Sequence, residues 1–179
     1  WRQSVWDVGQ PRILLEIKMP QTMEKPLMAM ENVFAGFWQM YDPPNPREKW
    51  FEGQYQMSFA IEIVSTEGKV HFYLRIPKGT RRQMESALYA QYPDAELQLV
   101  DDYTKGVPQN IPNKDWRMWG ATYKLDKSDV YPLKTYSKFF EQSPDTKEEK
   151  KVDPVAVLVE SLSRIGEGEH LWVQFLCEP

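Results

Sequence analysis

Residues 77–82, PKGTRR, gather three cationic side chains where a strand-like pattern ends and a helical pattern begins. A phosphate-binding loop directs several backbone amides at one anion, usually with the pattern G-x-x-x-x-G-K-[ST]. This segment has a single glycine, Gly79, and Lys78 precedes it. The pattern therefore favours a structural corner in which Gly79 turns the chain and Thr80 caps the following helix.

Two arginines complicate that interpretation. Arg81 and Arg82 would lie at the N-terminus of the helix, where cations oppose the helix dipole. Together with Lys78 they form a candidate contact for something anionic, either an acidic protein surface or a nucleic-acid backbone. A solvated pair of arginines is the alternative.

A second candidate lies on the preceding strand. His71, Tyr73 and Arg75 alternate with apolar residues, so they would share the face of the sheet opposite the core. In RNA-recognition domains, aromatic side chains on an open sheet face stack on bases. The glycine-and-phenylalanine motif of those domains is absent from KVHFYLRIP, and the alternative is that residues 115–179 cover this face.

No residue group has the arrangement that catalysis requires. Glu16 and Glu62 fall on one sheet face by alternation, with Lys18 and Arg75 beside them, and cross-strand ion pairs explain this set. A nucleophile, a base and an orienting partner are not found together. With one cysteine and two histidines in the chain, a metal site is not expected either. We therefore expect no enzyme, no metal and no cofactor.

The composition is that of an ordered globular protein. Of the 179 residues, 41% are hydrophobic and 13% aromatic, and the net charge is −4. An acidic chain is not a general nucleic-acid binder, so any basic patch must be local. No apolar run is long enough to cross a bilayer. The single cysteine, Cys177, fits a reducing compartment and is expected to pack. The chain starts at Trp1, and we expect it to be a piece of a longer protein.

The predicted helices and strands determine where these candidate site residues lie. Periodicity predicts the order strand, helix, strand, strand, helix, strand, with a tight hairpin turn at 66–69. This order is typical of an α+β ferredoxin-like βαββαβ unit, in which both helices cover one face of an antiparallel sheet. We place this unit at 12–100. The predicted elements are 12–19, 25–41, 56–64, 70–76, 81–91 and 95–100.

A smaller α+β block follows. Residues 101–114 look like a linker, and the block at 115–179 is expected to pack on the first unit or extend it. Its pattern predicts a strand in 115–125, an ambiguous segment at 128–141, a polar stretch at 143–152, a helix at 153–166 and a strand at 169–176. Whether it is a degenerate second copy of the first unit stays open.

Several segments resemble an uncharacterised family of membrane-associated proteins. The similar stretches include LLEIKMP at 14–20, SFAIEIVS at 58–65 and VHFYLRIP at 70–77. Further similar stretches are 25–37, 85–97, 100–103, 131–141 and 152–179. The family occurs notably in candidate-phyla-radiation bacteria, and its members are similar to components linked with type IV secretion or conjugation machinery and its ATPases.

The resemblance implies a membrane-proximal scaffold preceded by hydrophobic segments. No catalytic residue follows from it. We therefore expect a non-catalytic assembly domain at the cytoplasmic face of the membrane, the soluble part of a membrane-anchored protein. It would bind protein partners, either further copies of itself or a motor ATPase. The alternative is a nucleic-acid-binding module that uses either the open sheet face with His71, Tyr73 and Arg75 or the strand–helix corner with Lys78, Arg81 and Arg82, which we call the basic corner. Membrane contact would come only through segments outside this chain.

Overall fold

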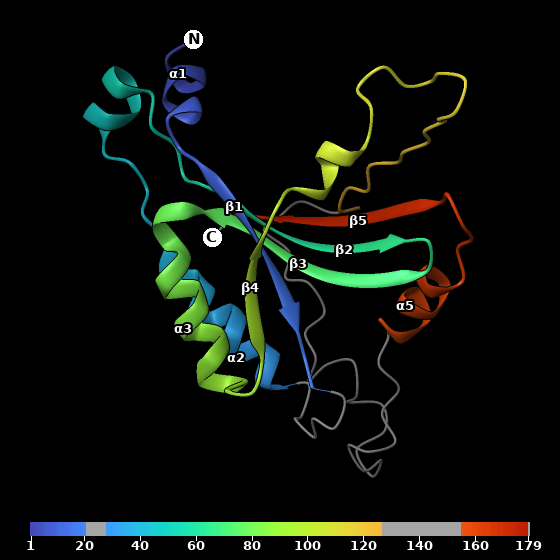
Figure 1. Cartoon of the computed structure of the whole chain (residues 1–179). Coiled ribbons are helices and arrows are strands. Elements are labelled where there is room, and N and C mark those ends of the chain that lie inside the picture. Colours follow the sequence, from blue (N-terminus) through green and yellow to red (C-terminus); the bar gives the residue numbers. More distant parts are fainter. Residues whose placement is uncertain (21–27, 127–154, 179) are drawn as a thin grey trace.

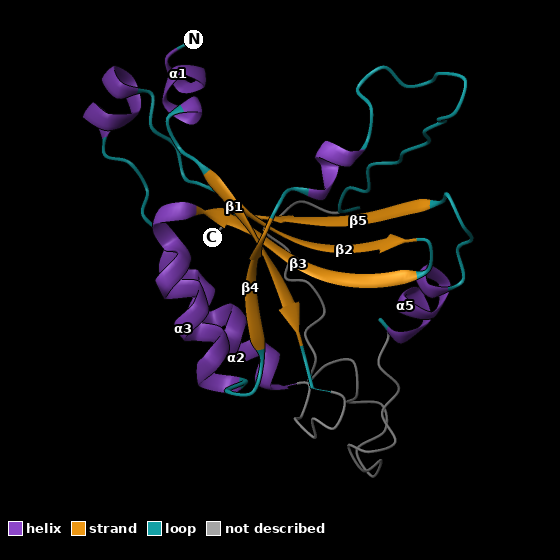
Figure 2. Cartoon of the chain, viewed as in Figure 1, coloured by secondary structure: helices purple, strands orange, loops and turns teal. Residues whose placement is uncertain are grey.

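A computed structural model of the chain describes residues 1–20, 28–126 and 155–178. It contains one antiparallel sheet of five strands in the order β4-β1-β3-β2-β5 (Figures 1 and 2). The strands are β1 (Arg12–Lys18), β2 (Phe59–Thr66), β3 (Lys69–Pro77), β4 (Glu96–Val100) and β5 (His170–Cys177). The first four have the order of a ferredoxin-like unit, so the predicted α+β fold is confirmed.

Two helices cover one face of this sheet. α2 (Met28–Phe37) and α3 (Arg81–Gln91) lie side by side against it (Figure 1). Their apolar residues meet those of the strands in a single core, which buries Val33, Phe37, Met84 and Leu88 from the helices. We call this side of the sheet the helix face. Burial of such side chains is the main source of stability in a domain of this kind.

The two helices approach each other closely at one glycine. A Cβ atom at Gly36 would lie 2.6 Å from the Cβ of Ala87 in α3. Two small residues at the crossing therefore allow α2 and α3 to pack together on the sheet. The helix predicted from periodicity, 25–41, extends beyond the observed C-terminal end, and its residues 25–27 lie outside the described ones. The structure ends α2 at Phe37 and continues with a 3-10 turn at Trp38–Met40.

The hairpin at the centre is tight. Thr66 pairs with Lys69, so only Glu67 and Gly68 form the turn, and both have positive φ, at 53° and 81°. This is the geometry that matches the twist of paired strands. The predicted turn at 66–69 is confirmed, and with it the register that places alternate β3 residues on opposite faces.

The C-terminal elements join the same sheet. β5 pairs with the outer side of β2, from Phe59–Cys177 to Thr66–His170. The helix α5 (Ala156–Ser163) lies near the hairpin end of β2 and β3 (Figure 1). Leu162 of α5 is fully buried, and its carbonyl oxygen accepts a hydrogen bond from the Ser65 hydroxyl at 2.7 Å.

One predicted strand is wrong. The pattern of residues 115–125 predicts a strand, but this segment forms neither helix nor strand (Figure 2). Its side chains Met118, Trp119 and Tyr123 are at least three-quarters exposed. An alternation of aromatic and polar residues is not sufficient for a strand when no sheet edge pairs with it. The predictions at 128–141 and 143–152 lie outside the described residues.

The N-terminal residues form an element that the sequence pattern does not predict. The helix α1 (Arg2–Val8) packs against a helical turn at Glu48–Glu52, beyond one end of the sheet (Figure 1). The guanidinium of Arg2 donates to the carbonyl oxygens of Trp50 and Phe51 at 3.0 and 2.9 Å. These hydrogen bonds join residues nearly fifty positions apart, so the local sequence pattern does not predict the position of this helix.

Candidate functional site

The sheet face opposite the helices carries a continuous polar row. Pairing aligns Gln98, Glu16, Tyr73, Glu62 and Gln174, one residue from each of the five strands. We call this side the polar face. Its alternation confirms that Glu16, Glu62, His71, Tyr73 and Arg75 lie opposite the core.

Arg75 is held between two carboxylates on this face. Its Nε donates to Glu62 Oε1 and its terminal nitrogen to Asp102 Oδ2, both at 2.7 Å. Glu62 is only 1% exposed, so its charge is buried with its partner. The hydrogen bond from Arg75 lowers the pKa of Asp102 well below its usual range, against the opposing effect of burial. The guanidinium is therefore already satisfied by two anions.

Tyr103 closes over the centre of the polar face. Its hydroxyl donates to Glu62 Oε2 at 2.8 Å and accepts from Gln174 Nε2 at 2.9 Å. Burial, and then the hydrogen bond to Glu62, raises the pKa of the Tyr103 hydroxyl. Its ring stacks on Tyr73 at 5.4 Å and meets Trp172 edge-on at 4.9 Å.

A local turn brings Tyr103 to this position. Asp102 precedes a 3-10 turn at Tyr103–Gly106, and its Oδ1 accepts from the backbone amide of Thr104 at 3.0 Å. The sequence pattern places these residues in a linker at 101–114. Asp followed by Thr two positions later is the signal for this turn. It indicates that a turn forms here, but not that the turn packs on the sheet.

His71 extends the aromatic stack. Its ring lies nearly parallel to Tyr73, 5.8 Å away, and its Nδ1 is 2.7 Å from Glu16 Oε1. The histidine and its carboxylate would form part of a catalytic relay only with a third group to act on. Within the described residues, Glu16 is the only side chain that hydrogen-bonds to His71.

This arrangement weakens the base-stacking hypothesis. Tyr73 has His71 on one side and Tyr103 on the other, so an incoming base would have to displace a ring. Glu16, Glu62 and Asp102 also place three carboxylates beside the aromatic rings. Nucleic-acid phosphates favour a basic surface. Among the described residues, Tyr103 and, from the 115–179 block, Trp172 and Gln174 lie over the centre of this face, and the rest of the expected cover, at 127–154, lies outside them.

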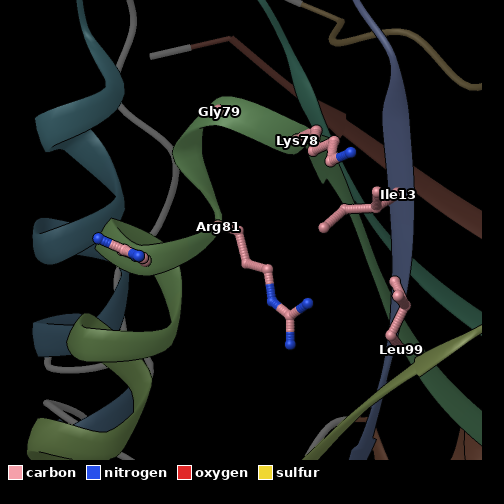
Figure 3. A pocket seen from close by; sticks show the side chains of 6 residues that line it. Ile13, Lys78, Gly79, Arg81 and Leu99 are labelled. Carbon is pink, nitrogen blue, oxygen red and sulfur yellow. The ribbon is translucent and has the colours of Figure 1, made fainter.

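The basic corner lies on the other side of the sheet. Lys78, Arg81 and Arg82 line a depression of about 380 Å³ together with Ile13, Gly79 and Leu99 (Figure 3). Arg81 extends from the start of α3 towards the strands that carry Ile13 and Leu99, which are helix-face residues (Figure 3). The six predicted site residues therefore form two separate sites on opposite faces.

The corner itself differs from the predicted one. The Thr80 side chain does not cap α3; its hydroxyl instead donates to the carbonyl of Pro77 at 2.9 Å. No atom lies within 4 Å of a Cβ built on Gly79, and its φ is not in the left-handed region, so a glycine is not required there. Arg81 is paired with Glu85 at 2.7 Å, which offsets part of the positive charge. The depression retains Lys78 and Arg82 as cations without a described carboxylate partner.

The outer edge of β5 is a third feature. β5 pairs with β2 on one side, and its other side has no backbone partner in the described part of the chain. The strand reads HLWVQFLC and contains no lysine, arginine, aspartate or glutamate. Leu171, Phe175 and Leu176 are 40%, 49% and 69% exposed. Exposed edges of natural sheets are usually protected by charges, prolines, bulges or a covering segment, and the residues of β5 itself include neither a charged residue nor a proline.

The segment after Asn113 lies beside this edge. The ring of Trp116 stacks on His170 at 5.2 Å, and Met118, Trp119 and Tyr123, further along the same segment, are exposed. Exposed apolar side chains therefore occur both on β5 and in the segment that contacts its first residue. An exposed group of this kind commonly marks an interaction site.

Neither metal sites nor membrane spans are found in the residues that the structure describes. No group of three or more histidine, cysteine or acidic side chains could hold a metal ion there. No helix in those residues is long and apolar enough to span a bilayer.

Comparison with known proteins identifies one relationship. Neither the curated proteins nor the solved structures include a match to this chain. The family described as Domain of unknown function (DUF8128) matches residues 22–179, which leaves α1 and β1 before the matched region. Because this match covers the two helices, the hairpin, the Tyr103 turn and the free edge of β5, the chain belongs to the DUF8128 family.

Proposed function

We propose that the chain is a non-catalytic assembly domain that acts through protein–protein contact. The observation that carries the proposal is the outer edge of β5, which pairs with no strand in the described residues, is eight residues long and is free of charged side chains. Unpaired N–H and C=O groups on such an edge can accept another strand, and neighbouring side chains then provide specificity. The exposed apolar side chains of β5, Leu171, Phe175 and Leu176, supply surface that a complex can bury.

The polar face supports the non-catalytic part of the proposal. Its ionisable groups are already paired with one another: Arg75 with two carboxylates, Tyr103 with Glu62, and His71 with Glu16. A catalytic group must present a free proton, a lone pair or a nucleophile to a substrate. Here the hydrogen bonds instead fasten the Tyr103 turn to the sheet.

The finer assignment rests only on the resemblance of the sequence segments described above to a family of membrane-associated proteins. On that ground we propose that the domain lies at the cytoplasmic face of the membrane, in the soluble part of a membrane-anchored protein of a type IV secretion or DNA-transfer apparatus. The partner would be a further copy or a motor ATPase. The full reading frame and its genomic neighbours test this assignment. Hydrophobic segments and an adjacent motor gene would support it, and a frame without either would argue against it.

The assembly proposal is tested by measuring association directly. Light scattering and sedimentation over a wide concentration range, alone and with the products of neighbouring genes, should detect a complex. Phe175→Lys places a charge on the free edge and should weaken that complex at least tenfold. Val157→Lys, on the exposed side of α5, is the matched control and should leave the complex intact. A chain that stays monomeric and binds none of these products would overturn the proposal.

The basic corner favours nucleic-acid binding as a second candidate. Lys78, Arg81 and Arg82 line one depression together with the apolar side chains of Ile13 and Leu99. Cations at such a site would contact phosphates, so binding should weaken as salt increases. Titration with single- and double-stranded DNA at two salt concentrations tests it. The double variant Arg81→Ala, Arg82→Ala should lower affinity, whereas Lys114→Ala with Arg117→Ala removes two cations elsewhere and should have less effect.

A further inference from the structure

We infer that the partner of β5 is β5 of a second copy of this chain, paired antiparallel about a twofold axis. This inference rests on the proposed function and names its partner. Pairing in this way would join two five-stranded sheets into one continuous sheet of ten. Because the symmetry repeats the same contact on both copies, a single favourable contact counts twice.

β4 and β5 are the outer strands of the described sheet, and the distribution of charge favours β5 for self-pairing. Each copy has a net charge of −4, so two copies repel each other, and a contact is opposed least where the surfaces that meet bring no further like charges together. β5 contains no acidic or basic side chain along its eight residues. β4 is five residues long, begins with Glu96, and its Gln98 is bonded to Lys18. The electrostatic free-energy cost of self-pairing is therefore lower at β5 than at β4.

The sequence of β5 is also compatible with pairing to itself. With the twofold axis at Val173, Leu171 of one copy lies opposite Phe175 of the other, and Val173 lies opposite Val173. These residues are on the helix face in both copies, because they pair with Ser65, Ile61 and Ile63 of β2. On the polar face, Trp172 lies opposite Gln174 and His170 opposite Leu176. This register keeps apolar side chains together on one face.

The flanking segment enlarges the contact. A strand of eight residues alone offers less than the roughly 1,200 Å² of total buried area that a stable interface needs. Met118, Trp119 and Tyr123 are 75%, 86% and 90% exposed and belong to the segment that Trp116 fastens to His170. Their burial against the second copy would supply the remaining area. We expect a dimer that forms reversibly with concentration.

Disulfide trapping tests the register. Directly opposed residues in an antiparallel pair have Cα atoms about 4.5–5.5 Å apart, within the range that a disulfide spans. In the full chain with Cys177→Ser, the variant Val173→Cys should form a disulfide-linked dimer under mild oxidation, and the yield should rise with protein concentration. The control is Val157→Cys in the same background, a 66% exposed position on α5, which should stay monomeric.

A second measurement covers the case in which Val173→Cys folds poorly. Hydrogen exchange of the unsubstituted protein at low and high concentration should show slower exchange in β5 at high concentration, with no such change in β4. Phe175→Lys should remove the difference while retaining the circular dichroism spectrum.

The outcomes separate this inference from the proposed function. Absence of the Val173 cross-link, together with concentration-independent exchange in β5, overturns the self-pairing. If a neighbouring gene product still binds and Phe175→Lys abolishes that binding, the assembly proposal stands and its partner is another protein. If neither association is found, both are wrong.

Discussion

Glu62 illustrates how much of the polar face depends on one side chain. Its carboxylate is buried in the middle of the polar row and accepts hydrogen bonds from Arg75 and Tyr103. A buried charge is tolerated when its partner is present, and removing one member leaves the other without compensation. The pairing of Glu62 with a β3 cation follows from alternation alone. The contributions of Asp102 and Tyr103 do not, because they belong to a turn whose docking depends on tertiary contacts.

Replacing this carboxylate should be costly. We expect Glu62→Ala to lower the free energy of unfolding by about 3 kcal/mol, since it leaves the partly buried Arg75 with Asp102 alone and removes the acceptor of Tyr103. Urea denaturation measures the change. The control is Arg164→Ala, which breaks the exposed pair with Glu160 and should change stability by less than about 0.5 kcal/mol. Equal effects of the two substitutions would contradict this account of the polar face.

Asp102 gives the fold a predictable sensitivity to acid. Its pKa in the folded chain is lowered, chiefly by the hydrogen bond from Arg75, whereas the unfolded chain titrates near pH 4. A lowered pKa contributes stability above the unfolded value, and that contribution is lost as the pH falls below it.

Removing this carboxylate should flatten the acid side of the stability curve. Between pH 5 and 2 we expect Asp102→Asn to lose less stability than the unsubstituted chain, although it is less stable at pH 7. Urea midpoints at several pH values in that window provide the test. Parallel curves for the two proteins would show that Asp102 is not the responsible group.

At the scale of elements, the β2–β3 hairpin is the most predictable part. Two alternating runs separated by a glycine-containing turn determine both the pairing and the faces, and the register from Ala60–Arg75 to Thr66–Lys69 agrees with that pattern. The segment 115–125 shows the limit of the same rule. Its residue types are those of a strand, but whether a strand forms depends on an edge that is available to pair, which local sequence does not encode.

Gly68 should be the least replaceable residue of this hairpin. Its φ is +81°, and an added Cβ would lie 2.9 Å from the carbonyl oxygen of Ser163. We expect Gly68→Ala to cost about 1–3 kcal/mol, from backbone strain and from the displacement of α5. Gly79→Ala is the matched control, because nothing lies within 4 Å of its added Cβ. Thermal unfolding of both variants measures the difference, and a Gly68 variant as stable as the control would disprove the argument.

At the scale of the whole molecule, the C-terminal elements belong to the same sheet as the ferredoxin-like unit. The order of its first four strands follows from the predicted βαββαβ pattern. The position of β5 does not, since either edge of that unit could have accepted a fifth strand. The choice of β2 reflects contacts far apart in the chain, such as the hydrogen bond between Ser65 and Leu162.

This arrangement predicts that the chain unfolds as one unit. Leu162→Ala should lower stability by about 2–4 kcal/mol, because Leu162 is fully buried between α5 and the sheet. Transitions followed by tryptophan fluorescence and by circular dichroism should coincide and shift together. Val157→Ala, on the exposed side of α5, should cause little change. Two separated transitions would instead indicate that the C-terminal elements unfold independently.

The pairing of β5 with β2 also determines when the fold can be completed. Cys177 pairs with Phe59, more than one hundred positions earlier, whereas the β2–β3 hairpin closes across two residues. Local pairs form early in folding, and distant pairs form late because their loops are costly to close. A ribosome therefore finishes β2 long before it makes β5. During that interval the nascent chain exposes the unpaired edge of a strand whose residues are mostly buried in the final fold.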